Sequence, residues 1–261
     1  MIASLPMYDW PEIRPATDAF WRALTGELRA RGIDAPDELD RTRAADKQWR
    51  DPDLLLSQTC GFPYVTGLRD TVRLVATPVY AVDGCDGSDY SSFLLVHRDC
   101  PAEDLAGLAP RTIAVNTPDS QSGWNALRHT VLRDTGRPVD AGGLLLTGSH
   151  RQSIRAVARG EADLCAVDPV CYALAGRFEP ETTAAVRILA RSDPTPTLPL
   201  ITSGRAGDDT LARLREALDA VISAPAVADV AQELAIAGFH RLTDRDYDRI
   251  RVIEPVAGLN A

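Results

Sequence analysis

Two stretches of the chain that are rich in hydroxyl side chains each lead into a predicted helix, and their residue types suit anion binding. Residues 116–124 read Asn-Thr-Pro-Asp-Ser-Gln-Ser-Gly-Trp, and residues 147–153 read Thr-Gly-Ser-His-Arg-Gln-Ser. The first N–H groups of a helix lack partners within the helix, and the helix dipole favours negative charge there. Two such segments predict a small oxyanion that is held by backbone dipoles and hydroxyls rather than by a lysine cluster.

The candidate ligand-binding residues of the first segment are Ser120, Gln121, Ser122 and Gly123. Serine is a preferred N-cap, so capping alone is the simplest interpretation of this segment. One cap needs only one hydroxyl, however, and the two serines together with Asp119 exceed that need. The excess favours ligand binding.

Ser149, His150 and Asp168 are the further candidates. A helix N-terminus disfavours a protonated imidazole, so we expect His150 to act as a neutral donor unless an anion is bound. Asp168 precedes a proline and could simply end a strand, or it could accept a hydrogen bond from a ligand hydroxyl or ammonium group. The sequence leaves both roles of Asp168 open.

A catalytic interpretation of the same residues is weaker. It would use Ser122 or Ser149 as nucleophile, His150 as base and Asp168 as the group that orients the base. Ser149 and His150 are neighbours in sequence, which makes a productive hydrogen bond between their side chains difficult. Pro118 stands where a G-x-S-x-G elbow needs its first glycine, and neither a P-loop nor a G-x-G-x-x-G motif occurs. We therefore expect no enzyme activity.

Composition narrows the class of protein further. The chain has 261 residues, 45% of them hydrophobic and 25% charged, as in ordinary globular proteins. Its formal net charge of −9 argues against nucleic acid or an anionic membrane as partner. The five cysteines include no CxxC pair, so we expect neither a metal site nor a cofactor. Cys60 and Cys85 could pair in an oxidising compartment, but two thiols are the simpler expectation.

The N-terminus shows neither a basic segment nor an apolar segment of the length that a secretory leader has. No run of eighteen apolar residues occurs, so we expect no membrane insertion. The sequence as it stands predicts a cytoplasmic monomer, or a periplasmic one if a leader has been removed.

Strands and helices alternate along the chain, which is typical of an α/β fold. Strands are predicted at 2–7, 54–57, 72–77, 92–97, 112–115, 164–167 and 186–190, and helices at 17–31, 124–133, 153–159, 210–223 and 227–237. The strands at 92–97 and 186–190 bracket the hydroxyl-rich segments. They predict a lobe at 94–191 inserted into another built from 1–93 and 192–261, with a ligand in the crevice at the carboxyl ends of strands.

A set of short motifs runs through nearly the whole chain: Leu5-Pro-Met-Tyr8, Gln58-Thr-Cys-Gly61, Pro78-Val-Tyr80, Tyr90-Ser-Ser92, Ser120-Gln-Ser-Gly123, Gly148-Ser-His150, Gly160-Glu-Ala-Asp163 and Asp168. In these motifs and in their order the chain resembles the phosphate- and phosphonate-binding solute receptors of ABC transporters. The resemblance implies a type 2 periplasmic-binding fold, in which two mixed sheets flanked by helices form two lobes joined by two hinge strands. It also implies a small anionic ligand and an ABC transporter permease as partner.

The family's functional residues carry over where the motifs match. The resemblance implies that Ser120, Gln121 and Ser122 give hydroxyl and N–H groups to the phosphonate oxygens, that His150 contacts the same group, and that Asp168 faces the cleft. Tyr8 would line the cleft from the other lobe, where we expect Thr59 and Cys60 to complete the pocket. The alternatives are a sensor, or a cytoplasmic enzyme on the same fold of the kind found in menaquinone or thiamin-precursor biosynthesis.

Overall fold

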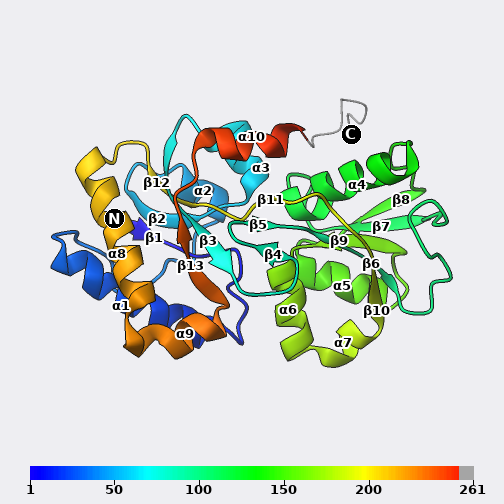
Figure 1. Cartoon of the computed structure of the whole chain (residues 1–261), viewed down its shortest axis with the longest axis horizontal. Coiled ribbons are helices and arrows are strands. Elements are labelled where there is room, and N and C mark those ends of the chain that lie inside the picture. Colours follow the sequence, from blue (N-terminus) through cyan, green and yellow to red (C-terminus); the bar gives the residue numbers. More distant parts are fainter. Residues whose placement is uncertain (253–261) are drawn as a thin grey trace. The chain divides into compact units, whose positions relative to one another are not determined.

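The computed structural model describes residues 1–252, which divide into two units (Figure 1). The first unit contains Met1–Ala81, Asp86–Ser88 and Pro196–Asp248. The second contains Val82–Cys85, Asp89–Thr195 and the described residues from Arg249 onward. An α/β architecture is therefore confirmed.

The first unit is built on a mixed sheet in the order β1-β2-β12-β3-β13. β1 is parallel to β2, and β12 is antiparallel to both β2 and β3. Every residue of β2 is buried, as expected for a strand covered on both faces. The bounds are β1 Ile2–Ala3, β2 Leu54–Gln58, β3 Val72–Tyr80, β12 Leu200–Ser203 and β13 Ile236–His240.

Two long helices supply most of the core of the first unit. α1 buries Phe20, Leu24 and Leu28, and α8 buries Leu214 and Leu218 in the same apolar cluster. The helices of this unit are α1 Arg14–Ala30, α2 Ala45–Trp49, α3 Gly61–Pro63, the π-helix η1 Tyr64–Leu68, α8 Asp208–Ser223, the 3₁₀ turn η3 Pro225–Val227, α9 Ala228–Glu233 and α10 Asp244–Val252, the last of which continues into the second unit.

The second unit has a mixed sheet in the order β10-β6-β9-β7-β8. β7 is parallel to both of its neighbours, so the carboxyl ends of β7, β8 and β9 lie at one edge of the sheet. The bounds are β6 Phe93–His97, β7 Thr112–Val115, β8 Gly143–Leu146, β9 Leu164–Val167 and β10 Val186–Arg191. Three short strands at the crossings between the units form a further sheet: β4 Cys85–Asp86, β5 Asp89–Tyr90 and β11 Thr195–Pro196.

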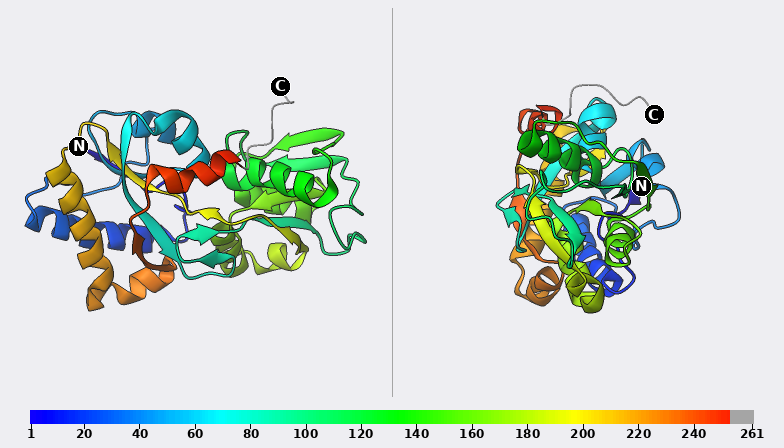
Figure 2. Two further views of the ribbon diagram at one scale, coloured as in Figure 1. Left: turned by 45° about the horizontal axis from the view of Figure 1, so that its top comes forward. Right: turned by 90° about the vertical axis from the view of Figure 1, so that its right-hand side faces the viewer.

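Helices cover both faces of the sheet of the second unit. Figures 1 and 2 show α4 on one face and α5, α6 and α7 on the other. Under α4, Trp124 and Leu127 pack on Ile113, Val115 and neighbouring strand residues in one apolar cluster. The helices are the π-helix η2 Gln121–Asn125, α4 Ala126–Thr135, α5 His150–Ala158, α6 Pro169–Phe178 and α7 Pro180–Ala184.

The unit boundaries differ from the lobe boundaries that the sequence predicts. β6 and β10, which contain most of the strands predicted at 92–97 and 186–190, pair antiparallel along their lengths, and β6 also pairs with β9. Both strands therefore belong to the sheet of the second unit. The chain passes from one unit to the other at 81/82 and 195/196, among other positions, and not at the predicted 93/94 and 191/192.

Two elements also depart from the sequence prediction. The predicted strand at 2–7 is only Ile2–Ala3 long. The predicted helix at 227–237 ends early, because Ala235 adopts a φ of 55° and the chain then pairs with β3 as β13. In this second case tertiary pairing overrides the local helical pattern.

Within residues 1–252, no helix is both long and apolar enough to cross a membrane. No disulfide joins any two of the five cysteines, all of which lie in the described part of the chain.

Candidate functional site

Polar segments follow the three adjacent parallel strands of the second unit. Asn116 comes directly after β7, the segment from Thr147 to Ser149 follows β8, and Asp168 follows β9. Carboxyl ends of parallel strands meet at one sheet edge, which is the usual position of ligand sites in α/β folds. The candidate residues of this unit therefore gather at one edge.

Segment 120–123 begins the first of the helices at this edge. Ser120 is the N-cap, and its hydroxyl oxygen accepts a hydrogen bond of 3.0 Å from the Gly123 N–H. The next five residues form a π-helical turn before α4 starts, and all of them are buried. Single π-turns are frequent at functional sites because they re-aim backbone groups.

His150 begins the second helix, α5, which starts three residues before the helix that the sequence predicted at 153–159. Ser149 is the N-cap, and its hydroxyl oxygen accepts a hydrogen bond of 3.3 Å from the Gln152 N–H. The Nε2 atom of His150 lies 2.8 Å from the Ser122 hydroxyl oxygen. This hydrogen bond joins the first turns of two helices and brings hydroxyl, imidazole and backbone N–H groups together.

The imidazole of His150 is held in its neutral form. Burial lowers the pKa of His150 to about 4, and the nearby backbone of Ala166 opposes this only in part. The N-terminal position in α5 disfavours a positive charge as well. The ring therefore acts near neutral pH as a neutral hydrogen-bonding group, which agrees with the sequence expectation.

Asn116 is a residue of this site that the sequence analysis did not select. Its Oδ1 atom is buried and has no hydrogen-bond partner among the described residues. A Cβ atom on Gly123 would lie 1.8 Å from that oxygen and 3.1 Å from Cε1 of His150. Gly123 thus lets the amide of Asn116 approach the helix start closely. The signal available in the sequence was the position of Asn116 at the end of a buried strand.

Asp168 has a structural role at the same edge. Its Oδ1 atom accepts hydrogen bonds from the N–H groups of Val170 (2.7 Å) and Cys171 (3.3 Å), so this buried carboxylate caps α6. The pKa of Cys171 is raised well above its ordinary value, mainly by burial of the thiol and to a smaller extent by the charge of Asp168. Burial, the charge of Asp168 and the charge of Asp83, in this order of size, raise the pKa of Cys85 to about 12.

The remaining candidates, Tyr8, Thr59 and Cys60, lie in the first unit. The Tyr8 ring meets the Tyr80 ring edge-on, with 5.4 Å between the centroids. Thr59 is fully buried, and its N–H donates to the Pro199 carbonyl at 3.1 Å. Cys60 is the N-cap of α3.

A serine–histidine pair alone does not make a hydrolase. The pair is present at 2.8 Å, but among residues 1–252 no carboxylate is hydrogen-bonded to the other ring nitrogen of His150. Asp168, the expected orienting acid, caps α6. The described residues also contain no cluster of three or more His, Cys, Asp or Glu side chains that could hold a metal ion.

The sequence matches one protein-family model, described as the periplasmic substrate-binding protein of a phosphonate ABC transporter, over residues 41–247. No curated protein sequence is significantly similar to the chain.

Solved structures with the same fold are numerous. A binding protein component of an ABC phosphonate transporter from Pseudomonas aeruginosa is 16% identical, with a TM-score of 0.77 over 97% of this chain and 85% of that one. PhnD1 from Prochlorococcus marinus, in complex with methylphosphonate, is 15% identical, with a TM-score of 0.71 over 97% and 95%. XAC2383 from Xanthomonas citri, bound to a chloride ion, is 17% identical, with a TM-score of 0.73 over 97% and 95%. At these identities the likeness establishes the type 2 periplasmic-binding fold.

Proposed function

The chain belongs to the periplasmic substrate-binding proteins of phosphonate ABC transporters, and from this premise we propose that it binds a phosphonate or phosphate through segment 120–123 and His150. The observation that carries the proposal is the 2.8 Å hydrogen bond between Ser122 and His150. It places two helix N-termini beside each other, and each favours negative charge through its dipole and N–H groups.

The attraction for the anion would come from these local dipoles. Arg151, the basic residue next to His150 in sequence, forms an ion pair with Glu179, which also pairs with Arg155 at 2.6 Å. A chain of net charge −9 gives an anion no long-range attraction either. Hydroxyl and backbone donors supply hydrogen bonds without a formal charge, which suits a site that must also release its ligand.

We further propose that binding occurs without chemistry, that the protein works in the periplasm as a monomer, and that it delivers its ligand to an ABC transporter permease. The family supports the transport role and the periplasmic location. The PhnD1 structure supports a phosphonate as ligand class, because that relative holds methylphosphonate. The participation of Tyr8, Thr59, Cys60 and Asp168 in ligand binding stays a prediction.

Calorimetric titration with methylphosphonate, phosphate, phosphite and sulfate tests the proposal. For Ser122→Ala we expect the binding free energy of the preferred phosphorus oxyanion to weaken by about 1–3 kcal/mol, the usual loss for a hydrogen bond to a charged group. Ser223→Ala is the matched control, since Ser223 is exposed at the end of α8 in the first unit. Unchanged affinity in Ser122→Ala would show that the anion does not bind at Ser122. Binding of an aromatic carboxylate, with no binding of any of these oxyanions, would favour an enzyme on the same fold.

A further inference from the structure

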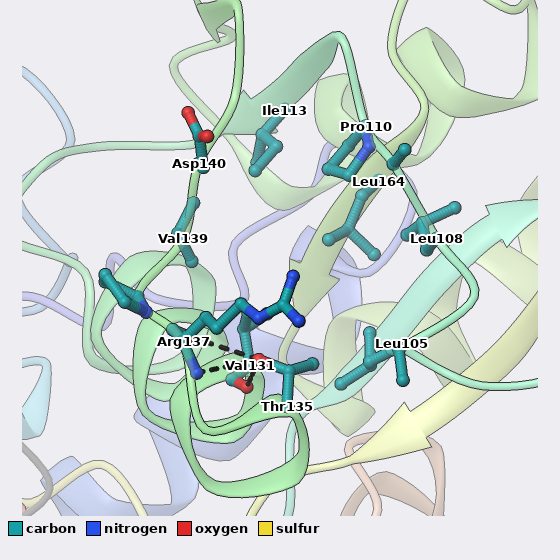
Figure 3. A pocket seen from close by; sticks show the side chains of 13 residues that line it. Leu105, Leu108, Pro110, Ile113, Val131, Thr135, Arg137, Val139, Asp140 and Leu164 are labelled. Atoms are coloured by element: carbon teal, nitrogen blue, oxygen red, sulfur yellow. Dashed lines mark hydrogen bonds between the residues drawn. The ribbon is translucent and has the colours of Figure 1, made fainter.

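A cavity lies in the second unit, away from the serine–histidine site (Figure 3). Its volume is about 320 Å³, near the lower end of the range of small-molecule pockets. Ile113, near the amino end of β7, and Leu164, at the amino end of β9, both line it. The serine–histidine site follows the carboxyl ends of these strands, so this distal cavity occupies the other end of the sheet and shares no residue with it.

The walls of the distal cavity are mainly aliphatic. Ile113 and Leu164 are almost completely buried, with 0% and 1% of their surface exposed. Figure 3 shows these two residues together with further apolar side chains around the cavity: Leu105, Leu108, Pro110, Val131 and Val139. Such walls would hold an alkyl chain through the hydrophobic effect.

One cationic side chain, that of Arg137, lies among these apolar walls. In Figure 3 the guanidinium of Arg137 extends toward the middle of the ring of labelled side chains, while the Asp140 carboxylate points away from it. The Arg137 backbone N–H donates to the Thr135 hydroxyl at 3.2 Å. Within residues 1–252, however, the guanidinium has no ion pair or hydrogen bond. An arginine fork that is open in this way matches a carboxylate or another planar anion.

The end of α4 does not compete for the same guanidinium. The Gly136 N–H donates to the Leu132 carbonyl at 2.9 Å, and the Thr135 hydroxyl donates to the Val131 carbonyl at 2.7 Å. Neither of these carbonyl groups accepts a hydrogen bond from the Arg137 guanidinium in the described part of the chain, so the guanidinium remains available to an external anion.

We propose that the distal cavity binds a small amphiphilic monoanion of the medium-chain carboxylate class, with the alkyl chain against the aliphatic walls and the carboxylate on Arg137. The proposal does not depend on the phosphonate site, because the two sites have separate residues. α4 connects them, since segment 120–123 precedes the start of this helix, and Val131 and Thr135, near its end, line the cavity.

A homologous series of carboxylates from butanoate to octanoate, titrated by calorimetry in the presence of excess methylphosphonate, tests the cavity. Each added methylene should lower Kd about fourfold until the chain fills the cavity. An alkylammonium of the same length should bind more weakly than the carboxylate. The proposal is overturned if no member binds, if affinity is independent of chain length, if the ammonium binds equally well, or if methylphosphonate displaces the carboxylate competitively.

Arg137→Gln tests the anchoring group. We expect octanoate to bind about two- to fivefold more weakly to this variant, the range for a solvent-accessible ion pair, while its affinity for methylphosphonate stays unchanged. Arg98→Gln is the matched control, because Arg98 is also an exposed arginine of the second unit but does not line the cavity. Equal octanoate affinity in Arg137→Gln and Arg98→Gln would assign the binding to some other place on the protein.

Discussion

Three helices of the second unit start after adjacent parallel strands, yet they are capped in two different ways. The η2–α4 segment and α5 begin with serine caps, Ser120 and Ser149. α6 begins with the buried carboxylate of Asp168. The three starts have the same relation to the sheet, so the chemistry of the cap is the difference between them.

The comparison teaches which helix start can accept an external anion. The carboxylate of Asp168 already provides negative charge at the N-terminus of α6, so a second anion there would be repelled. A serine cap satisfies one N–H group and brings no charge, so the dipoles of α4 and α5 remain uncompensated. The neutral caps are also the two that the Ser122–His150 hydrogen bond brings together.

The largest expected effect is that of Gly123→Ala, which would disrupt the serine-capped start of the η2–α4 segment. The new Cβ would lie 1.8 Å from Asn116 Oδ1, so the amide and the helix start must separate. We expect a loss of about 3 kcal/mol in the free energy of unfolding, at the upper end for overpacking, together with loss of anion binding. Urea denaturation and calorimetry measure the two quantities.

Gly176→Ala is the matched control, since Gly176 lies inside the aspartate-capped helix α6 and a Cβ there would meet nothing within 4 Å. This change should stabilise the protein by up to about 1 kcal/mol through helix propensity. Equal stability of the two glycine variants would contradict the close packing around Asn116.

A smaller effect is expected from the titration of His150. Its pKa is about 4 in the folded protein, against 6.5 for an unperturbed histidine. The unfolded chain therefore binds the proton more readily, and this contribution to stability is complete above pH 6.5 and is lost as the pH falls toward 4. Between pH 7 and pH 5 the loss amounts to about 2 kcal/mol.

His150→Asn should lack this part of the pH dependence, which denaturation at both pH values would reveal. A variant that lost the same stability as the wild type between pH 7 and pH 5 would show that His150 is not held neutral by burial.

The smallest effect is expected when the serine cap of α5 is replaced by an aspartate. Ser149→Asp gives α5 the kind of cap that α6 has. Aspartate and serine are equally good caps, so the free energy of unfolding should change by less than about 0.5 kcal/mol. The added charge should weaken anion binding about tenfold, from a like-charge interaction at roughly 6 Å in a partly solvated site.

Ser149→Asn is the control for this exchange, because asparagine caps a helix without a charge and should leave the anion affinity near that of the wild type. If Ser149→Asp and Ser149→Asn bound the anion equally well, the charge of the cap would not matter. The explanation for the difference between α5 and α6 would then fail.

The sequence was sufficient to find that both hydroxyl-rich segments lead into helices, because caps and hydroxyl-rich segments are local signals. The helices begin at Gln121 and His150, each three residues before its predicted start. The resemblance placed Ser122 and His150 near the same ligand group, but their direct hydrogen bond could not be predicted, because it depends on β7 and β8 being neighbours in the sheet. The capping role of Asp168 was not among the interpretations that the sequence left open, which were a strand end and a ligand contact. The signal for it was the proline that follows at the first helical position.

Long-range pairing explains the elements that the sequence analysis missed. β12 lies between β2 and β3, although more than a hundred residues separate it from them in the chain. β8 is only four residues long and half exposed, so its pattern carries little signal. Neither placement follows from residues close by in sequence.

The position of β12 also sets the order in which the chain can fold during synthesis. The sheet of the second unit is complete once Arg191 has been made, because all five of its strands lie between Phe93 and that residue. The sheet of the first unit begins with Ile2 but has a gap at its centre until Leu200–Ser203 emerges. Domains generally fold as units during translation, and non-local strand pairing is slow. The inserted unit, which carries the serine–histidine site, is therefore ready to fold while the unit that surrounds it in sequence still waits for its central strand.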